Sequence, residues 1–380
     1  MTPQGPAAAT DAYLDTLPLA LRRAAEANTL AAHLVAIAML AVAVGVCWLV
    51  LKSGALGALR RRYSLTESPS LIAQVVCTGA FGAVLALACA PLAFYGAWRL
   101  DPGHDLVQLA REMVGRGVLM IAAAAILAPI IYGLMRIAPR RWGLMVGVVP
   151  GLAIFALTWA PFVLASGSVA LPPAPAGPAR EALVQLIAET HTPAKQIYIS
   201  PNPQIDADVT GTPDNARVVV SQGMWTKTPP DEICAAVGHL MGHYAHRDQL
   251  SLALVLGLLA LGGGLAVQVL FAPAARALGA REVQGPADPA ALPVLAAVAA
   301  VYLAVAGVGF NNFIRLVNVR ADQYSLDHAR APDGLARSLV RNWRGDRVDP
   351  GAAEQILFYD HPSLQSRLDH AMRWKAAHPS

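Results

Sequence analysis

The stretch DEICAAVGHLMGHYAHRD, residues 231–248, contains two histidines four positions apart. Thr228 is a residue type that caps helices, Pro229 suits a first helical turn, and two acidic residues follow. We therefore predict a helix that begins near Thr228. Positions i and i+4 are about 400° apart around a helix, so they share a face. His239 and His243 then project from one side, where their two imidazoles can bind a single metal ion.

The residue between the two ligands is Leu240. In the zinc-binding pattern HExxH, a glutamate at this position activates the metal-bound water. Leucine can neither accept a proton nor orient a water molecule. General-base assistance contributes about 10² to 10⁴ in rate, so the sequence predicts a metal site whose hydrolytic activity is severely impaired.

The longer segment KTPPDEICAAVGHLMGHYAHRD, residues 227–248, resembles the active-site helix of integral-membrane zinc metallopeptidases of the type I CAAX prenyl protease and HtpX-like group. There the corresponding elements are DEI, AV and HExGH. Further resembling blocks cover most of the chain after about residue 90: MRIAPRRWGL (135–144), RVVVSQGMWTKT (217–228), RADQYSLD (320–327) and FYDHPSLQSRL (358–368). The resemblance implies a polytopic α-helical membrane protein with an α+β zinc-metallopeptidase lobe, mostly helical with a small sheet, in the bacterial inner membrane.

The resemblance also implies a third zinc ligand, a glutamate in a motif resembling RxxEYxAD on a second helix. Within RADQYSLD, Gln323 falls on the ligand position and Asp327 on the motif's acidic residue. An amide oxygen brings no charge to offset the desolvation of Zn²⁺, so we expect Zn²⁺ binding that is weak or absent. The neighbouring carboxylate of Asp322 lies about 100° around the helix from Gln323 and would need a local rotation to reach the metal.

The resemblance implies functional roles for two more segments. His361 and Arg367, in DHPSLQSR, match family positions near the substrate carbonyl that stabilise the oxyanion. The family's edge strand, which pairs with the peptide substrate, falls on Asp206, Ala207 and Asp208. Both aspartates depart from the Asn-Ala-Tyr-like sequence of that strand, so the usual substrate pairing is in question.

The composition is that of a membrane protein, because 55% of the residues are hydrophobic and only 14% are charged. A helix needs about 20 apolar residues to cross about 30 Å of hydrocarbon. Six uncharged stretches are long enough, and we expect each to contact lipid: Asn28 to Leu51, Leu71 to Trp98, Gly117 to Met135, Trp142 to Ser166, Gln249 to Ala275 and Leu292 to Phe310.

These spans divide the chain into four parts. Residues 1–171 form a membrane region with four spans, 172–248 the first part of a peptidase-like lobe, 249–310 a two-span hairpin and 311–380 the second part of the lobe. Short strands are expected at Gln196 to Ser200 and Arg217 to Ser221. Neither polar part has enough apolar surface to fold alone, so we expect the two to pack together.

The net charge is +4, and the basic residues cluster beside the spans, as at Arg60–Arg62. This position indicates that they orient the spans in the membrane rather than bind nucleic acid. If these loops are cytoplasmic, the lobe is on the opposite side, whereas the resemblance implies a cytoplasmic lobe, so the side stays open. No cleavable signal is expected before the first span. The four cysteines lack CxxC spacing and indicate no disulfide framework.

Three functional classes follow. The first is an active zinc endopeptidase that hydrolyses peptide bonds in membrane-associated or prenylated substrates. The second is a degenerate member, a pseudoprotease that binds peptides or acts as a scaffold. The third, a transporter or structural protein, is disfavoured because the spans lack paired intramembrane charges. We expect the peptidase architecture with peptide or membrane-protein partners and activity that is impaired or absent.

Overall fold

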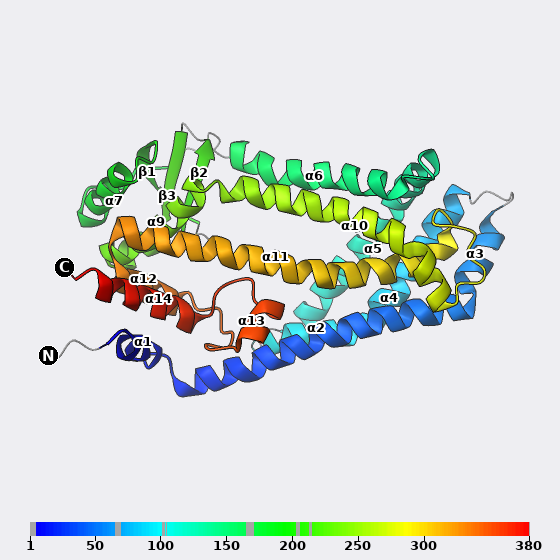
Figure 1. Cartoon of the computed structure of the whole chain (residues 1–380), viewed down its shortest axis with the longest axis horizontal. Helices are drawn as coiled ribbons and strands as arrows, with labels where there is room; N and C mark the ends of the chain where they lie inside the picture. Colours follow the sequence, from blue (N-terminus) through cyan, green and yellow to red (C-terminus); the bar gives the residue numbers. More distant parts are fainter. Residues whose placement is uncertain are drawn as a thin grey trace. The chain divides into compact units, whose positions relative to one another are not determined.

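The computed structural model describes residues 5–64, 70–100, 103, 105–164, 171–202, 206–212 and 215–379 (Figure 1). It divides into two compact units. The first, which we call the lobe, comprises Met1–Ala27, Ile154–Val255 and Val308–Ser380. The second, which we call the bundle, comprises Asn28–Ala153 and Leu256–Gly307.

Six helices in the described part of the chain are long and apolar enough to cross a membrane, which confirms the predicted number. They are α2 (Leu19–Ser53), α4 (Leu71–Leu100), α5 (Leu106–Ile137), α6 (Trp142–Leu164), α10 (Asp248–Leu278) and α11 (Leu292–Ala329). Ser166, the predicted end of the fourth span, lies outside the described residues. The short helices α3 (Ala55–Tyr63) and η1 (Pro289–Ala291) complete the bundle.

Glycines determine how α6 packs against α10 within the bundle. A Cβ atom added at Gly147 would lie 2.8 Å from the backbone oxygen of Leu261, and one added at Gly143 would meet the backbone oxygen of Gly264 even more closely. Helices in lipid associate through small residues that let their backbones approach, so these positions hold the pair together.

The four cysteines are free, and Cys47, Cys77 and Cys234 are buried, as their apolar settings predict. Another buried group of the bundle is an ion pair between Arg60 of α3 and Asp288. Asp288 also accepts hydrogen bonds from the backbone N–H groups of Gln284 (3.0 Å) and Ala290 (2.9 Å). This pair therefore fixes the turn that leads into η1.

The lobe contains a three-stranded sheet of β1 (Ala194–Ser200), β2 (Ala207–Thr212) and β3 (Asn215–Ser221). Its order is β1-β3-β2, with β1 parallel and β2 antiparallel to β3. The two strands expected from the apolar runs are therefore present, each slightly longer than predicted. Strand β2 lies at an edge of this sheet.

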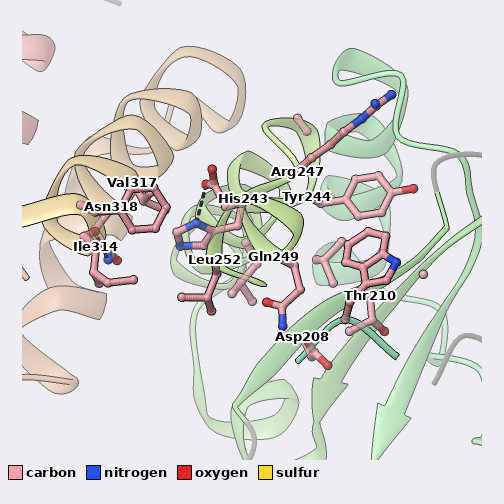
Figure 2. Close-up of a pocket in the computed structure, with 17 residues that line it drawn as sticks. Asp208, Thr210, His243, Tyr244, Arg247, Gln249, Leu252, Ile314, Val317 and Asn318 are labelled. Atoms are coloured by element: carbon pink, nitrogen blue, oxygen red, sulfur yellow. Dashed lines mark hydrogen bonds and ion pairs between the residues drawn. The ribbon is translucent and has the colours of Figure 1, made fainter. Parts of the chain in front are cut away.

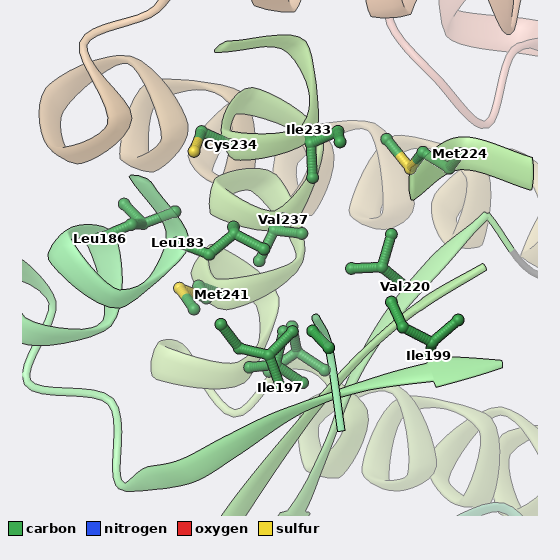
Figure 3. Packing of buried hydrophobic residues seen from close by; sticks show 13 residues of the cluster. Leu183, Leu186, Ile197, Ile199, Val220, Met224, Ile233, Cys234, Val237 and Met241 are labelled. Atoms are coloured by element: carbon green, nitrogen blue, oxygen red, sulfur yellow. The ribbon is translucent and has the colours of Figure 1, made fainter. Parts of the chain in front are cut away.

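Helices α7 (Pro178–Glu189) and α9 (Pro230–Ala245) contribute to the main core of the lobe with the sheet (Figure 3). Ile233, Val237 and Met241 recur every four residues on α9 and are fully buried. His239 and His243 each follow a core residue by two positions, about 200° around the helix. The packing of α9 against the sheet therefore turns both imidazoles away from the core.

The start of α9 differs from the prediction by one residue, because Pro229 is its N-cap and Thr228 instead ends α8 (Gln222–Lys227). The Thr228 hydroxyl accepts a hydrogen bond from Arg341 (2.7 Å) rather than capping the helix. Arg341 also pairs with the buried Glu232 (2.8 Å). These bonds join the first part of the lobe to α12 (Pro332–Arg341) in the second part.

A second core joins α12, α14 (Leu364–Ala377) and the amino-terminal helix α1 (Pro6–Leu14). Leu14, Leu335 and Leu368 are buried in it. The amino-terminal segment thus packs into the lobe, whereas the sequence division grouped it with the first four spans. The remaining helix, α13 (Ala352–Phe358), has no buried residue.

Candidate metal and peptide site

Two glycines bring α11 unusually close to the histidine helix. A Cβ atom added at Gly242 would lie 3.0 Å from the Cα atom of Ala321, and one at Gly238 would lie 3.1 Å from the hydroxyl of Ser325. That hydroxyl donates to the backbone oxygen of Ala235 (2.7 Å). The glycines therefore allow α11 to place its side chains directly beside the imidazoles.

The two histidines face one another through their Nε2 atoms, which lie 3.0 Å apart. Their other ring nitrogens are held by carboxylates. His239 Nδ1 lies 2.8 Å from Asp322 Oδ1, and His243 Nδ1 lies 3.0 Å from Asp248 Oδ2. The structure thus brings together both histidines predicted as ligands and adds two aspartates that orient them.

This arrangement determines where each ring carries its hydrogen. An ionised carboxylate only accepts hydrogen bonds, so each Nδ1 bears the proton and donates it. Burial lowers the pKa of His239 below its ordinary value, against the opposing effect of the Asp322 hydrogen bond and charge. A neutral His239 ring then directs its Nε2 lone pair toward His243 Nε2, 3.0 Å away, so that one cation can contact both ring nitrogens.

Both carboxylates are buried and paired with arginine. Asp322 accepts two hydrogen bonds from Arg367, one from Nε (2.7 Å) and one from Nη2 (2.6 Å). Asp248 pairs with Arg320 (2.7 Å). Since each arginine fixes a carboxylate that in turn fixes an imidazole, the two rings are held by a continuous network.

Gln323 and Asp327 do not take part in this network. The Gln323 amide donates to Asp327 (2.8 Å), which also accepts a hydrogen bond from the Trp374 indole (2.8 Å). Within the described residues no hydrogen bond or ring contact joins Gln323 to either histidine. The role of Gln323 as third ligand therefore stays a prediction.

Another amide residue, Asn318, lies one turn before Asp322 on α11. Asn318 is buried, with 6% of its surface exposed, and it lines the same cleft as His243 (Figure 2). The motif RxxEYxAD fits here in a second register, five residues earlier, with Arg315 at its start, Asn318 in place of the glutamate, and Ala321 and Asp322 retained at its end. The retained alanine was the signal in the sequence that distinguishes the two registers.

The two residues assigned to oxyanion stabilisation make different contacts in the structure, and their role stays a prediction. Arg367 reaches the site, but through its ion pair with Asp322. His361 Nδ1 lies 2.9 Å from Asp360 and 3.3 Å from Arg344. Within the described residues, no hydrogen bond or ring contact links His361 to the histidine pair.

A cleft of about 640 Å³ opens beside His243. Leu240 lines it, as do residues of β2, α10, α11 and α6, among them Asp208, Thr210, Gln249, Val317 and Trp159. Of the predicted substrate strand, Ala207 and Asp208 begin β2, whereas Asp206 precedes it and accepts a hydrogen bond from the Ser221 N–H (2.7 Å). Burial raises the pKa of Asp208.

Comparison with known proteins agrees with this geometry. The model of peptidase family M48 matches residues 173–375. Similar curated proteins include an uncharacterized metalloprotease, YhfN, of Bacillus subtilis (28% identity; 50% of this chain, 46% of the relative) and a Protease HtpX homolog 1 of Streptomyces coelicolor (30%; 50% and 68%). The chain thus matches less than half the length of YhfN.

A similar solved structure is that of Ste24p from S. mikatae, with a TM-score of 0.55 and 16% identity. The likeness covers 84% of this chain and 81% of that one. At this identity the likeness concerns the fold, a mostly helical membrane protein with a small sheet.

Zinc, which the family implies, fits the residues present only in part. The facing Nε2 atoms suit two ligand positions, since carboxylate-held histidines are the usual zinc-binding form. Catalytic zinc sites use three protein ligands, and no group of three histidine, cysteine or acidic residues in the described part of the chain is arranged to hold a metal. Among the described residues, the two histidines therefore supply two of the three ligands that such a centre uses.

Proposed function

The chain belongs to peptidase family M48, and from this premise we propose that it is a membrane-embedded member that binds extended peptide segments and hydrolyses them slowly or not at all. Its six apolar helices and its relatives indicate an integral membrane protein, which is consistent with a bacterial inner membrane. Its lineage reaction is the hydrolysis of peptide bonds in membrane-associated proteins.

The observation that carries this proposal is the position of Leu240 on the wall of the cleft beside His243. The general base of the family would have to stand there to reach a water held by the histidines. The two carboxylates bonded to the rings do not replace it, because Asp322 and Asp248 face the Nδ1 sides of the rings. Both are also already paired with arginines.

The third ligand supports the same proposal. We propose that Asn318 occupies the position of the family's glutamate, since it lies one turn from Asp322 and lines the cleft with His243. A neutral amide at this position weakens Zn²⁺ binding. If Gln323 were the third ligand instead, Zn²⁺ binding would be weakened for the same reason, because glutamine is also a neutral amide. Mutation of each residue distinguishes the two assignments.

Peptide binding remains possible without hydrolysis because the cleft keeps its edge strand. Strand β2 is bonded to β3 along one side, and an extended peptide can add to the free edge of a sheet through its backbone. Leu240, Val317 and Trp159 supply apolar contacts in the same cleft. Membrane-associated and unfolded segments, which are apolar and extended, suit such a surface.

The test uses purified protein in detergent with an unfolded substrate protein and a prenylated peptide. Binding is measured by photo-crosslinking from the position of Thr210 on β2, and hydrolysis by product analysis with and without chelator. The proposal expects crosslinks to peptide and no chelator-sensitive products. Chelator-sensitive cleavage contradicts the proposed loss of catalysis, whereas an absence of crosslinks contradicts peptide binding in this cleft.

A further inference from the structure

Helix α13, AAEQILF, has its apolar residues on the outside. Ala352, Ala353, Ile356 and Leu357 are exposed, and Ile356 and Leu357 expose 48% and 49% of their surface. These four positions fall within about 140° of the helix circumference. The exposed surface is thus a continuous apolar face.

The polar residues of α13 lie on the opposite side of the helix from this apolar face. Glu354 pairs with Arg347 (2.6 Å), and the Gln355 amide donates to the Pro350 carbonyl (3.2 Å). A surface helix in water shows the opposite distribution, with charged residues outside and apolar residues against the core. The distribution in α13 is that of a helix whose outer side meets a non-aqueous medium.

The carboxyl-terminal end of α13 is fixed to the spanning helix α11. The Arg315 guanidinium donates to the carbonyls of Gln355 (2.5 Å) and Tyr359 (3.2 Å), and the Asn312 amide donates to that of Ile356 (2.8 Å). The Gln355 carbonyl also accepts the backbone N–H of Tyr359 (3.2 Å), whereas the Ile356 and Tyr359 carbonyls lie at the helix end, where carbonyls lack intrahelical partners and a cation is favourable. The apolar face is therefore held in place.

The attachment to α11 also determines how far α13 lies from the hydrocarbon core of the membrane. The apolar stretch of α11 ends at Phe310, and Arg315 lies about 7.5 Å further along the helix axis. The headgroup layers add about 5 to 7.5 Å on each side of the hydrocarbon core, so Arg315 lies at their outer edge. The residues of α11 that hold α13 thus lie at the level of the lipid headgroups.

We propose that α13 is an interfacial anchor whose Ile356 and Leu357 side chains insert into the boundary between headgroups and acyl chains. Its partner is the lipid surface, which continues from the spanning part of α11. Helices of this kind bury an apolar face about 5 to 10 Å into that boundary. The chain leaves α13 through the buried Tyr359 toward His361, so the anchor also ties that segment to the membrane.

The test places a fluorophore on Ile356→Cys or Leu357→Cys in full-length protein in phosphatidylcholine vesicles, with the unaltered chain labelled to subtract its native cysteines. The matched control is Val184→Cys on α7, whose native side chain is equally exposed, at 48%. Acyl chains brominated near the headgroup should quench the α13 labels by about twofold or more and leave Val184→Cys unchanged, as interfacial insertion requires.

Three results would overturn the proposal. Equal lipid quenching at positions 356 and 184 would show that α13 has no special contact with lipid. Strong quenching of the α13 labels by aqueous iodide would place the apolar face in water. Protection of the α13 labels from both quenchers would show that protein, and not lipid, covers the face.

Discussion

Asp322 Oδ1 lies 2.8 Å from His239 Nδ1, although 83 positions separate the two residues in the chain. This contact joins the two polar parts of the chain at the centre of the candidate site. It depends on the close approach of α11 to α9 and on the bidentate support of Arg367. The orientation of His239, the first candidate ligand, is therefore a tertiary property, produced by residues outside its own helix.

Replacing Asp322 should damage both folding and metal binding. Asp322→Asn removes the charge partner of the largely buried Arg367, and breaking a buried pair costs about 3 to 5 kcal/mol. Loss of the histidine's carboxylate partner should also weaken Zn²⁺ binding by about 10- to 100-fold. Thermal unfolding and calorimetric Zn²⁺ titration check the two effects. In the control Asp327→Asn, on the exposed side of α11, both quantities should stay near their original values.

The contact between α9 and α11 should not tolerate a larger residue at the glycines. In Gly242→Ala the new Cβ atom would lie 3.0 Å from both the Ala321 Cα and the Tyr324 Cβ atoms. Overpacking of this kind costs about 1 to 3 kcal/mol, measured as a lower unfolding free energy. The control Gly223→Ala adds a Cβ atom whose nearest neighbour is 4.0 Å away. Equal stability of the two variants would show that the helices are not in close contact at Gly242.

The carboxylate of Asp333 should make the free energy of unfolding depend on pH in the acid range. Burial favours a raised pKa for Asp333, but hydrogen bonds from Lys375 and Tyr13 outweigh it and hold the pKa below its usual value. The ionised Asp333 side chain therefore stabilises the folded state fully above its unfolded-state pKa, and this stabilisation is lost as the pH falls through the lower folded-state pKa.

Because Asp333 is partly exposed, its contribution should be below about 1 kcal/mol. The melting temperature of Asp333→Asn should therefore lie slightly below that of the unaltered chain at pH 7, and the difference should be smaller at pH 3. A difference that is unchanged between these two pH values would contradict the assignment.

The sequence determined the spans and the histidine helix because both are local properties. Apolar length predicts a span, and the spacing of His239 and His243 predicts a shared face. The register of the motif on α11 did not follow from periodicity, and the retained Ala321 was its one local signal. An uninterrupted helix carries both RLVNVRAD and RADQYSLD, and only the packing of Ala321 against Gly242 brings Asp322 to the histidine. The docking of α1 likewise depends on a core contributed by distant helices.

The two registers predict different outcomes for restoring the third ligand. If Asn318 occupies the ligand position, Asn318→Glu should bind Zn²⁺ more tightly than the unaltered chain, while Gln323→Glu should not. A glutamate places a charged ligand on the metal, which a neutral amide does not. Metal analysis after dialysis against a mild chelator checks this without any measurement of activity. A gain from Gln323→Glu alone would restore the original assignment.

The central claim, that the fold is intact and catalysis is lost with the base and the third ligand, is tested most directly by peptide hydrolysis in four proteins. These are the unaltered chain, Leu240→Glu, Asn318→Glu and the double variant. We predict no chelator-sensitive hydrolysis in the unaltered chain or in Asn318→Glu, little in Leu240→Glu, and measurable zinc-dependent turnover in the double variant. Zinc-dependent, chelator-sensitive hydrolysis by the unaltered chain would contradict the claim.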